Sequence, residues 1–279
     1  MLKLIIIVII FALLQKKIRF YFVTKKHKKT YPIMKGAEPY FIKKGKTGVL
    51  LLHGLTSTPQ ELRFLAKYLA SKNFSVYAPL IKGHGTNVID LARTKEKDWE
   101  NSALKGFDKL SKSTNRVYVI GSSMGGNLSF RIATKRNVEG IVVMGTAMFF
   151  KRQLFNKILF KFIKLFKNFV RKEYPDEKIK KLVKKKTQYM EFPLNCISDL
   201  IKLIRISEKD LPKITAPSLI MQSSTDHILP KENAQWIYKH IGSVKKRIFM
   251  VPNSYHVFCI DKNRNIAFKE IYRFIKETS

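Results

Sequence analysis

Acidic residues and cysteines are scarce in this sequence. It holds 20 Asp and Glu residues against 54 Lys and Arg residues, which gives a formal net charge of +34 at pH 7. The two cysteines, Cys196 and Cys259, are too few for a disulfide framework, and neither stands in a metal-ligand spacing. We therefore expect both to be buried apolar residues. The sequence has no zinc-finger spacing, RNP-like aromatic block or helix-turn-helix pattern, so we expect no nucleic-acid partner.

The excess of positive charge then has two remaining explanations. The lysines are spread over the whole chain rather than gathered in one stripe, which favours a general bias in residue usage. Attraction to an anionic membrane surface is the second explanation.

The N-terminus carries an almost wholly apolar stretch. Residues Leu2 to Leu14 are apolar except for Lys3, and the apolar character resumes from Ile18 to Val23. A helix over residues 1–23 would be about 34 Å long, enough to cross a bilayer if its basic side chains reach the interface. Because no small-x-small cleavage site or lipobox cysteine follows, we expect an uncleaved membrane anchor over residues 1–23. A cleaved signal peptide and a buried helix are the alternatives.

The segment after this stretch is heavily basic. Basic flanks stay on the cytoplasmic side of a membrane, so the anchor predicts that the rest of the chain faces the cytoplasm. A secreted or soluble form is the alternative location. Residues 24–46 have the character of a polar linker with a short strand at Tyr40–Ile42.

Strands and helices alternate along residues 47–279, a length that suffices for one large α/β domain. Continuous apolar runs predict strands buried on both faces of a sheet, over 48–53, 75–78, 117–120, 140–145, 218–222 and 247–251. Helices are expected over 59–72, 98–110, 126–133 and 264–276. The first begins with Pro59 and a capping box between Thr58 and Glu61. This alternation predicts a mostly parallel sheet with helices on both faces.

The order of strand, G-x-S-x-G and helix describes a nucleophile elbow. Val117–Ile120 is a buried-type strand, Gly121-Ser122-Ser123-Met124-Gly125 follows at once, and a helix begins at Gly126. A nucleophilic serine projects from a tight, strained turn, so the residues two before and two after it must be small. Ser123 is therefore the candidate nucleophile. An ordinary glycine-rich turn with two incidental serines is the alternative interpretation.

Two further residues complete a catalytic triad in the order Ser, Asp, His. Asp226 follows the 218–222 strand, and His256 follows the 247–251 strand. Loops at the carboxyl ends of parallel strands gather the functional groups of an open α/β sheet. Asp199, Asp210 and Asp261 follow no predicted strand, and we expect His53 to shape its turn rather than to carry protons.

These residues predict acyl transfer. His256 would accept the Ser123 proton as the hydroxyl attacks a carbonyl, and Asp226 would fix the imidazole tautomer. The backbone N–H groups of Met124 and Leu55 are the expected oxyanion donors. Since covalent acyl transfer needs neither a metal nor an organic cofactor, we expect none.

The sequence resembles the α/β-hydrolase family of carboxylesterases and monoacylglycerol lipases, in particular small bacterial and archaeal esterases. The resemblance runs from Gly36 to the C-terminus and rests on HGLTSTPQE, APLIKGHGT, Asp98-Trp99, GSSMGG, Asp226 and Ser254-Tyr255-His256. It implies an α/β-hydrolase fold, a small acyl-ester or lipid-like substrate, and an oxyanion donor in the turn that holds Leu55. The apolar N-terminus and the Lys- and Phe-rich insertion depart from the family pattern, so acyl-chain length is not predicted.

The segment between the 140–145 strand and Pro212 has no strand character, and the resemblance implies that residues 147–211 form a helical cap over the acyl pocket. Within it, Phe149–Lys172 is predicted to be a basic amphipathic helix. Its apolar face either packs on the core and lines the pocket, or also docks on an anionic bilayer.

The sequence leaves three functions open. The first is a serine esterase or lipase acting on carboxylic esters, and the second is an acyltransferase or thioesterase on the same triad. The third is a membrane-tethered, non-catalytic lipid-binding protein with a hydrolase fold. The oligomeric state is not predicted.

Overall fold

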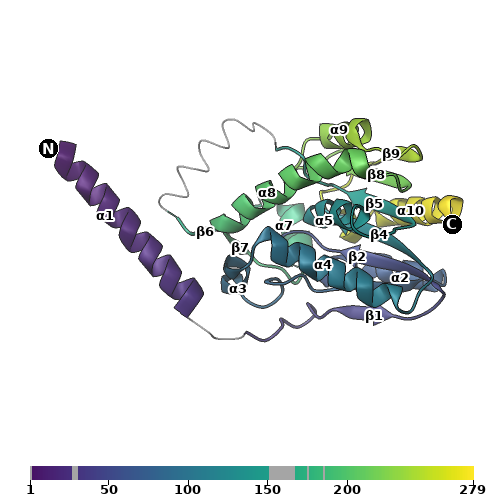
Figure 1. The fold of residues 1–279 in the computed structure, drawn as a ribbon, viewed down its shortest axis with the longest axis horizontal. Coiled ribbons are helices and arrows are strands. Elements are labelled where there is room, and N and C mark those ends of the chain that lie inside the picture. Colours follow the sequence, from purple (N-terminus) through teal and green to yellow (C-terminus); the bar gives the residue numbers. More distant parts are fainter. Residues whose placement is uncertain (1, 27–30, 151–166, 175, 185) are drawn as a thin grey trace.

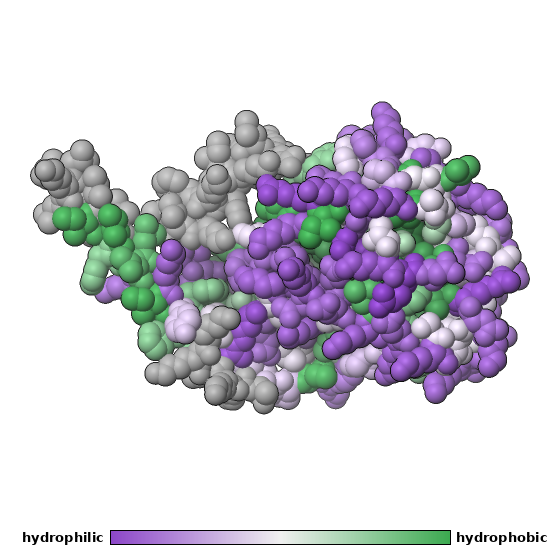
Figure 2. Space-filling view, in the orientation of Figure 1, coloured by the Kyte–Doolittle hydropathy of each residue, from purple (hydrophilic) through white to green (hydrophobic). Residues whose placement is uncertain are grey.

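The computed structural model describes residues 2–26, 31–150, 167–174, 176–184 and 186–279. An N-terminal helix, α1 (Leu2–Tyr21), stands away from a compact α/β body and continues into a π-helical turn, Phe22–Lys26 (Figure 1). Its C-terminal end touches the body, because the Phe20 ring packs against Phe169 and Lys16 Nζ donates to the Lys167 carbonyl at 3.1 Å. Figure 2 shows apolar residues gathered along α1, whereas this face of the body is mostly hydrophilic.

Helix α1 does not meet the requirements for a membrane-spanning segment. No helix in the described part of the chain is both long enough and apolar enough to cross a bilayer. In α1, Lys3, Lys16, Lys17 and Arg19 break up the apolar sequence. The described helices therefore do not support the predicted spanning anchor over residues 1–23 or the cytoplasmic orientation inferred from it.

The body is built on a seven-stranded sheet with the order β1-β3-β2-β4-β5-β8-β9, and its α/β class agrees with the prediction. Strand β1 runs antiparallel to β3 at one edge, and the other neighbouring strands are parallel. The strands are β1 (Tyr40–Ile42), β2 (Thr47–Leu52), β3 (Ser75–Ala78), β4 (Arg116–Ser122), β5 (Gly140–Met144), β8 (Ser218–Ser223) and β9 (Lys246–Val251).

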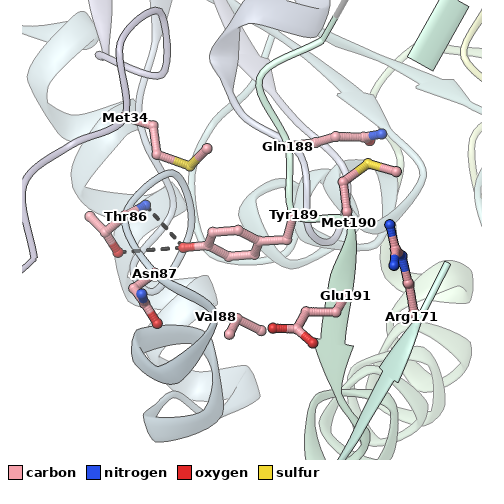
Figure 3. A pocket seen from close by; sticks show the side chains of 9 residues that line it. All are labelled: Met34, Thr86, Asn87, Val88, Arg171, Gln188, Tyr189, Met190 and Glu191. Atoms are coloured by element: carbon pink, nitrogen blue, oxygen red, sulfur yellow. Dashed lines mark hydrogen bonds between the residues drawn. The ribbon is translucent and has the colours of Figure 1, made fainter. Parts of the chain in front are cut away.

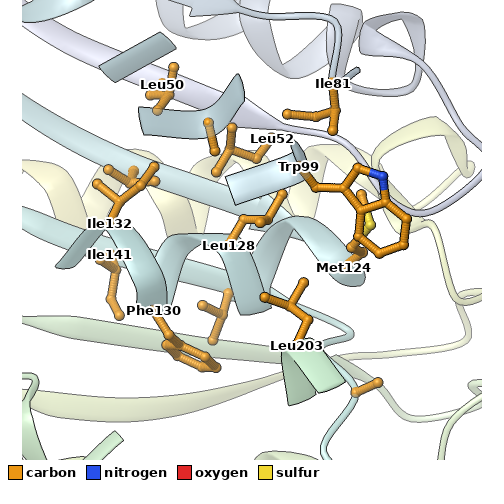
Figure 4. Packing of buried hydrophobic residues seen from close by; sticks show 14 of the residues in the cluster. Leu50, Leu52, Ile81, Trp99, Met124, Leu128, Phe130, Ile132, Ile141 and Leu203 are labelled. Carbon is orange, nitrogen blue, oxygen red and sulfur yellow. The ribbon is translucent and has the colours of Figure 1, made fainter. Parts of the chain in front are cut away.

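Helices cover both faces of the sheet because successive strand residues point to opposite sides. On one face, Leu50 and Leu52 pack with Trp99 and Leu128 in the cluster of Figure 4. This face is covered by α3 (Val88–Arg93), α4 (Glu96–Ser111), α5 (Met124–Ala133), α8 (Leu194–Asp210) and α9 (Glu232–His240). On the other face, strand residues such as Leu51 pack against α2 (Arg63–Ser71) and α10 (Arg264–Thr278). Each fully buried leucine stabilises the fold by about 1.5–3 kcal/mol.

The segment between β5 and α8 contains a small hairpin that the sequence did not indicate. Strand β6 (Phe169–Arg171) pairs antiparallel with β7 (Glu191–Pro193), and α7 (Glu177–Lys184) lies between them. The predicted absence of strands here is therefore wrong. The predicted helix Phe149–Lys172 is also wrong at its C-terminal end, where β6 forms, and its residues 151–166 lie outside the described residues.

The predicted capping box at Thr58 and Glu61 is absent. Residues Pro59–Leu62 form a 3₁₀ turn that leads into α2, and the Thr58 side chain makes no cap hydrogen bond. Its hydroxyl donates instead to the Thr187 carbonyl at 2.8 Å. Glu61 is engaged with the turn after β2, which leaves no carboxylate to complete the box.

Candidate active site

Ser123 stands on the sharp turn between β4 and α5. Its backbone φ of +53° lies in the left-handed region, which is strained for a residue with a side chain. A Cβ on Gly121 would lie 2.1 Å from the Gly125 carbonyl oxygen, and one on Gly125 would lie 2.1 Å from the Leu52 oxygen. Only glycine fits at either position, which explains the spacing of the G-x-S-x-G motif.

Two backbone contacts fix the position of Ser123. Its N–H donates to the Met144 carbonyl at 2.8 Å, and its own carbonyl accepts from Gly126 N at 2.9 Å. The ring of His256 lies beside the same strand end, because a Cβ on Gly145 would be 3.2 Å from His256 Cε1. Ser123 and His256 therefore both lie at the carboxyl end of β5. No hydrogen bond joins their side chains in the described structure, and such contacts often tighten only when substrate binds.

Asp226 and His256 form a direct pair. The distance between His256 Nδ1 and Asp226 Oδ2 is 2.7 Å, and both side chains are buried. Asp226 also accepts hydrogen bonds from Gln222 Nε2 at 2.7 Å and from the N–H groups of Ile228 and Leu229 at 2.8 and 2.9 Å. Burial alone would raise the pKa of Asp226, but His256 and these N–H donors hold it below its ordinary value. The carboxylate is therefore ionised at neutral pH.

The loop that carries His256 is held by a second carboxylate, Asp261. Its Oδ2 accepts from the Ser254 hydroxyl at 2.9 Å and from Tyr255 N at 2.8 Å. The Ser254 carbonyl in turn accepts from Thr225 Oγ1 at 2.7 Å, which links this loop to the one that carries Asp226. The sequence did not indicate a role for Asp261 at the site, because this residue follows no predicted strand. Its distance of five residues from His256 was the available signal.

The two predicted oxyanion donors lie on either side of Ser123. Met124 is the first residue of α5, so its N–H has no carbonyl partner in the preceding turn of the helix. Leu55 follows Gly54 in the turn after β2, and a Cβ on Gly54 would lie 3.3 Å from Ser123 Cβ. These positions are compatible with the expected roles, which stay predictions.

The other histidines that the structure describes are structural or exposed. His53 is buried, accepts from Ile81 N at 3.2 Å through Nε2, and has Nδ1 2.9 Å from the Gly54 carbonyl oxygen. Burial lowers the pKa values of His53 and His84, so both rings are neutral at pH 7. His227 and His240 are exposed, and His27 lies outside the described residues.

No metal site forms among the residues that the structure describes, where no group of three His, Cys, Asp or Glu side chains converges. Cys196 and Cys259 are buried free thiols, and burial raises the pKa of each. Neither thiol is poised as a nucleophile.

A cavity of about 410 Å³ lies between the body and the hairpin (Figure 3). Met34, Thr86, Asn87 and Val88 line it from the body, and Arg171 and Gln188–Glu191 line it from the hairpin. Tyr189 ties the two sides together, because its hydroxyl donates to the Gly83 carbonyl at 3.0 Å and accepts from Thr86 N at 2.9 Å. Ser123 and His256 do not line this cavity.

Comparison with known proteins places the chain in a family. Residues 43–263 match the family Hydrolase_4, serine aminopeptidase S33. The chain is 31% identical to the thermostable monoacylglycerol lipase of Bacillus sp. (strain H-257) over 88% of this chain and 96% of that protein. It is 28% identical to a carboxylesterase of Bacillus subtilis (strain 168), over 86% and 96% of the two proteins.

A solved structure from a study of LipS and LipT, two metagenome-derived lipolytic enzymes, superposes with a TM-score of 0.80 at 28% identity. The match covers 88% of this chain and all of the solved chain. Together with the elbow and the parallel sheet, these matches confirm the predicted relationship: the chain belongs to the serine aminopeptidase S33 family of α/β-hydrolases.

Proposed function

We propose that this protein hydrolyses carboxylic esters, of the carboxylesterase or monoacylglycerol-lipase type, through an acyl-enzyme on Ser123. The observation that carries the proposal is the 2.7 Å contact between Asp226 and His256 beside the strained elbow of Ser123. The named activities of the two Bacillus relatives support the choice of esters as substrates.

The chemistry follows from the tautomer of His256. Because the Nδ1–H group of His256 donates a hydrogen bond to Asp226, Nε2 carries the lone pair that accepts the Ser123 proton. Oγ then attacks the ester carbonyl, and the N–H groups of Leu55 and Met124 stabilise the negative oxygen of the tetrahedral intermediate. His256 returns the proton to the departing alcohol, and water releases the acyl group by the reverse sequence. Residues 47–279 form the hydrolase domain in this proposal, with residues 147–211 as its cap, and residues 24–46 are the linker and entry segment that contributes the edge strand β1.

Fluorophosphonate labelling beside p-nitrophenyl ester turnover tests the proposal. Wild type is expected to be labelled at one site and to hydrolyse the ester, and Ser123→Ala is expected to lose both. A folded wild-type protein that is neither labelled nor active would contradict the proposal and favour a non-catalytic lipid-binding role. Turnover that depends on an added alcohol acceptor would favour acyl transfer, and a strong preference for thioesters would favour a thioesterase.

We further propose that α1 lies on the surface of an anionic membrane rather than across it. Several apolar side chains of α1 are exposed, and Ile7, Phe11 and Tyr21 are each about 60% exposed. The net charge of +34 complements an anionic surface. The contacts of Phe20 and Lys16 with residues 167–169 would hold the cap region close to the lipid.

Vesicle co-sedimentation tests this second proposal. Full-length protein is expected to bind anionic vesicles more tightly than neutral ones, and to release them as salt rises. The triple variant Phe11→Ser, Leu14→Ser and Ile18→Ser is expected to lose binding. Its matched control changes three exposed apolar residues of the body, Phe64, Val244 and Ile266, to serine. Equal binding by both triple variants would contradict a role for α1.

A further inference from the structure

A buried glutamate closes the turn that holds one predicted oxyanion donor. Glu61 is only 2% exposed. Its Oε1 accepts from Gly54 N at 2.7 Å, and its Oε2 accepts from the Ser57 hydroxyl at 2.6 Å. The carboxylate therefore binds the turn at both ends, immediately beside Ser123.

These contacts set the direction of the Leu55 N–H group. The Gly54 carbonyl accepts from Ser57 N at 3.2 Å and lies 2.9 Å from His53 Nδ1. Since a trans peptide is planar, the Leu55 N–H points opposite to that carbonyl. With both the N–H and the carbonyl of Gly54 fixed, the Leu55 N–H has little freedom to turn away from the nucleophile.

The charged partner of Glu61 comes from the cap segment, the described part of residues 147–211. Lys186 Nζ lies 3.6 Å from Glu61 Oε2, and the lysine side chain is only 8% exposed. The residues that follow Lys186 run along the same turn: Thr187 N donates to Gln60 Oε1 at 2.6 Å, and Tyr189 N donates to the Thr56 carbonyl at 3.0 Å. The cap segment and the turn therefore form one hydrogen-bonded unit around a buried ion pair.

Charge explains why this pair is more than a packing contact. A carboxylate that accepts hydrogen bonds while ionised holds its donors about twice as strongly as a neutral acceptor does. Burial alone would raise the pKa of Glu61, but Lys186, Ser57 and Gly54 together hold it below its ordinary value. Without Lys186, the buried carboxylate would lose its ion-pair partner, which favours uptake of a proton by the carboxyl group.

We propose that Glu61 and Lys186 are positioning residues for the oxyanion hole, and that through them the cap segment sets the direction of the Leu55 N–H. This inference rests on the proposed ester hydrolysis. Neither residue contacts the reacting atoms; each acts through the turn.

Kinetics of Lys186→Met, Lys186→Arg, Glu61→Gln and the double variant Glu61→Gln/Lys186→Met test the inference. Lys180→Met is the matched control, because Lys180 also lies in the cap segment and forms an exposed pair with Glu177. Complete loss of one oxyanion donor costs about 10²–10³ in rate. Lys186→Met, Glu61→Gln and the double variant displace the turn without removing the donor, so each is expected to lower kcat by about 10-fold with KM nearly unchanged. Lys186→Arg should recover most of kcat, and Lys180→Met should match wild type.

Counting active sites by fluorophosphonate labelling separates positioning from folding. The double variant removes both charges of the buried pair, so it is expected to fold and to melt above Lys186→Met, with kcat per labelled site still reduced. If the variants lower only the melting temperature and keep the wild-type kcat per labelled site, the pair is merely structural and the inference is wrong. A wild type without labelling or turnover would instead overturn the proposed function, and the inference with it.

Discussion

Two carboxylates serve the His256 loop in different ways. Asp226 contacts the imidazole ring itself, whereas Asp261 holds the backbone and the Ser254 hydroxyl just before the ring. Both are buried, and both lie close to the same loop. Substituting each by asparagine therefore separates control of the imidazole from control of the loop.

Asp226→Asn is expected to lower kcat by about 10⁴-fold, because an amide does not hold the tautomer that leaves Nε2 free to accept a proton. Asp261→Asn keeps the ring contact, so its loss should be much smaller. Ester turnover per fluorophosphonate-labelled site measures both. A larger loss in Asp261→Asn would mean that the wrong carboxylate was assigned to the triad.

The depressed pKa of Asp226 also predicts how its contribution to stability varies with pH. The folded pKa lies below the unfolded value of about 3.9, so the stabilisation is fully present above that pH and is lost as pH falls through the folded value. The difference in unfolding free energy between wild type and Asp226→Asn should therefore shrink on acidification. Urea unfolding at a series of pH values measures it, and a difference that grows toward low pH would refute the assigned sign.

The residues that sequence could identify are those with a local signal. Ser123 stands in a motif whose steric reason is visible in the spacing of its glycines, and Asp226 and His256 each follow a predicted strand. Glu61 had a local signal for a different role, since its place three residues after Thr58 imitates a capping box. Its actual partners are Gly54, Ser57 and Lys186, and no local pattern predicts the contact with Lys186, which lies far along the chain.

At the scale of elements, burial determined what could be predicted. The central strands are continuous apolar runs because both faces are covered, and they were placed within one or two residues of their bounds. Strands β6 and β7 are three residues each and partly exposed, and they form only by pairing with each other across α7. The basic amphipathic pattern before β6 continues through it, so periodicity alone predicted a helix there.

A buried ion network joins three helices on one face of the sheet. Arg131 on α5 pairs with Glu100 on α4 at 3.0 Å and with Asp210 at the end of α8. Burial would raise the pKa of Glu100, but the Arg131 and Lys135 cations hold it below its ordinary value. The network thus attaches α8, the last α-helix of residues 147–211, to the two helices that flank the elbow strand.

Arg131→Met is expected to cost about 3 kcal/mol of unfolding free energy, because it leaves two buried carboxylates without their shared cation. Arg136→Met is the control, since Arg136 makes an exposed pair with Asp108 at 2.7 Å and exposed pairs contribute little. Urea unfolding of both variants at pH 7 measures the difference. Equal destabilisation by the two variants would show that the buried network of Arg131 contributes no more to stability than the exposed pair of Arg136 does.

At the scale of the whole molecule, repulsion among the positive charges behind the net charge of +34 opposes the stabilisation that the ion pairs contribute. Positive side chains spread over one body repel each other and destabilise its compact state. Salt screens this repulsion, whereas the buried pairs around Arg131 and Glu61 are screened much less. Added salt should therefore remove more repulsion than attraction.

The melting temperature is accordingly expected to rise as NaCl increases from about 0.05 to about 0.5 M, most steeply at the low end where the screening length changes most. Differential scanning fluorimetry measures the rise, with sucrose at matched osmolality as the uncharged control. Sucrose acts by exclusion from the surface, so its effect should be gradual rather than steep at low concentration. A melting temperature that falls with NaCl would mean that exposed ion pairs stabilise this fold more than its surplus of lysine destabilises it.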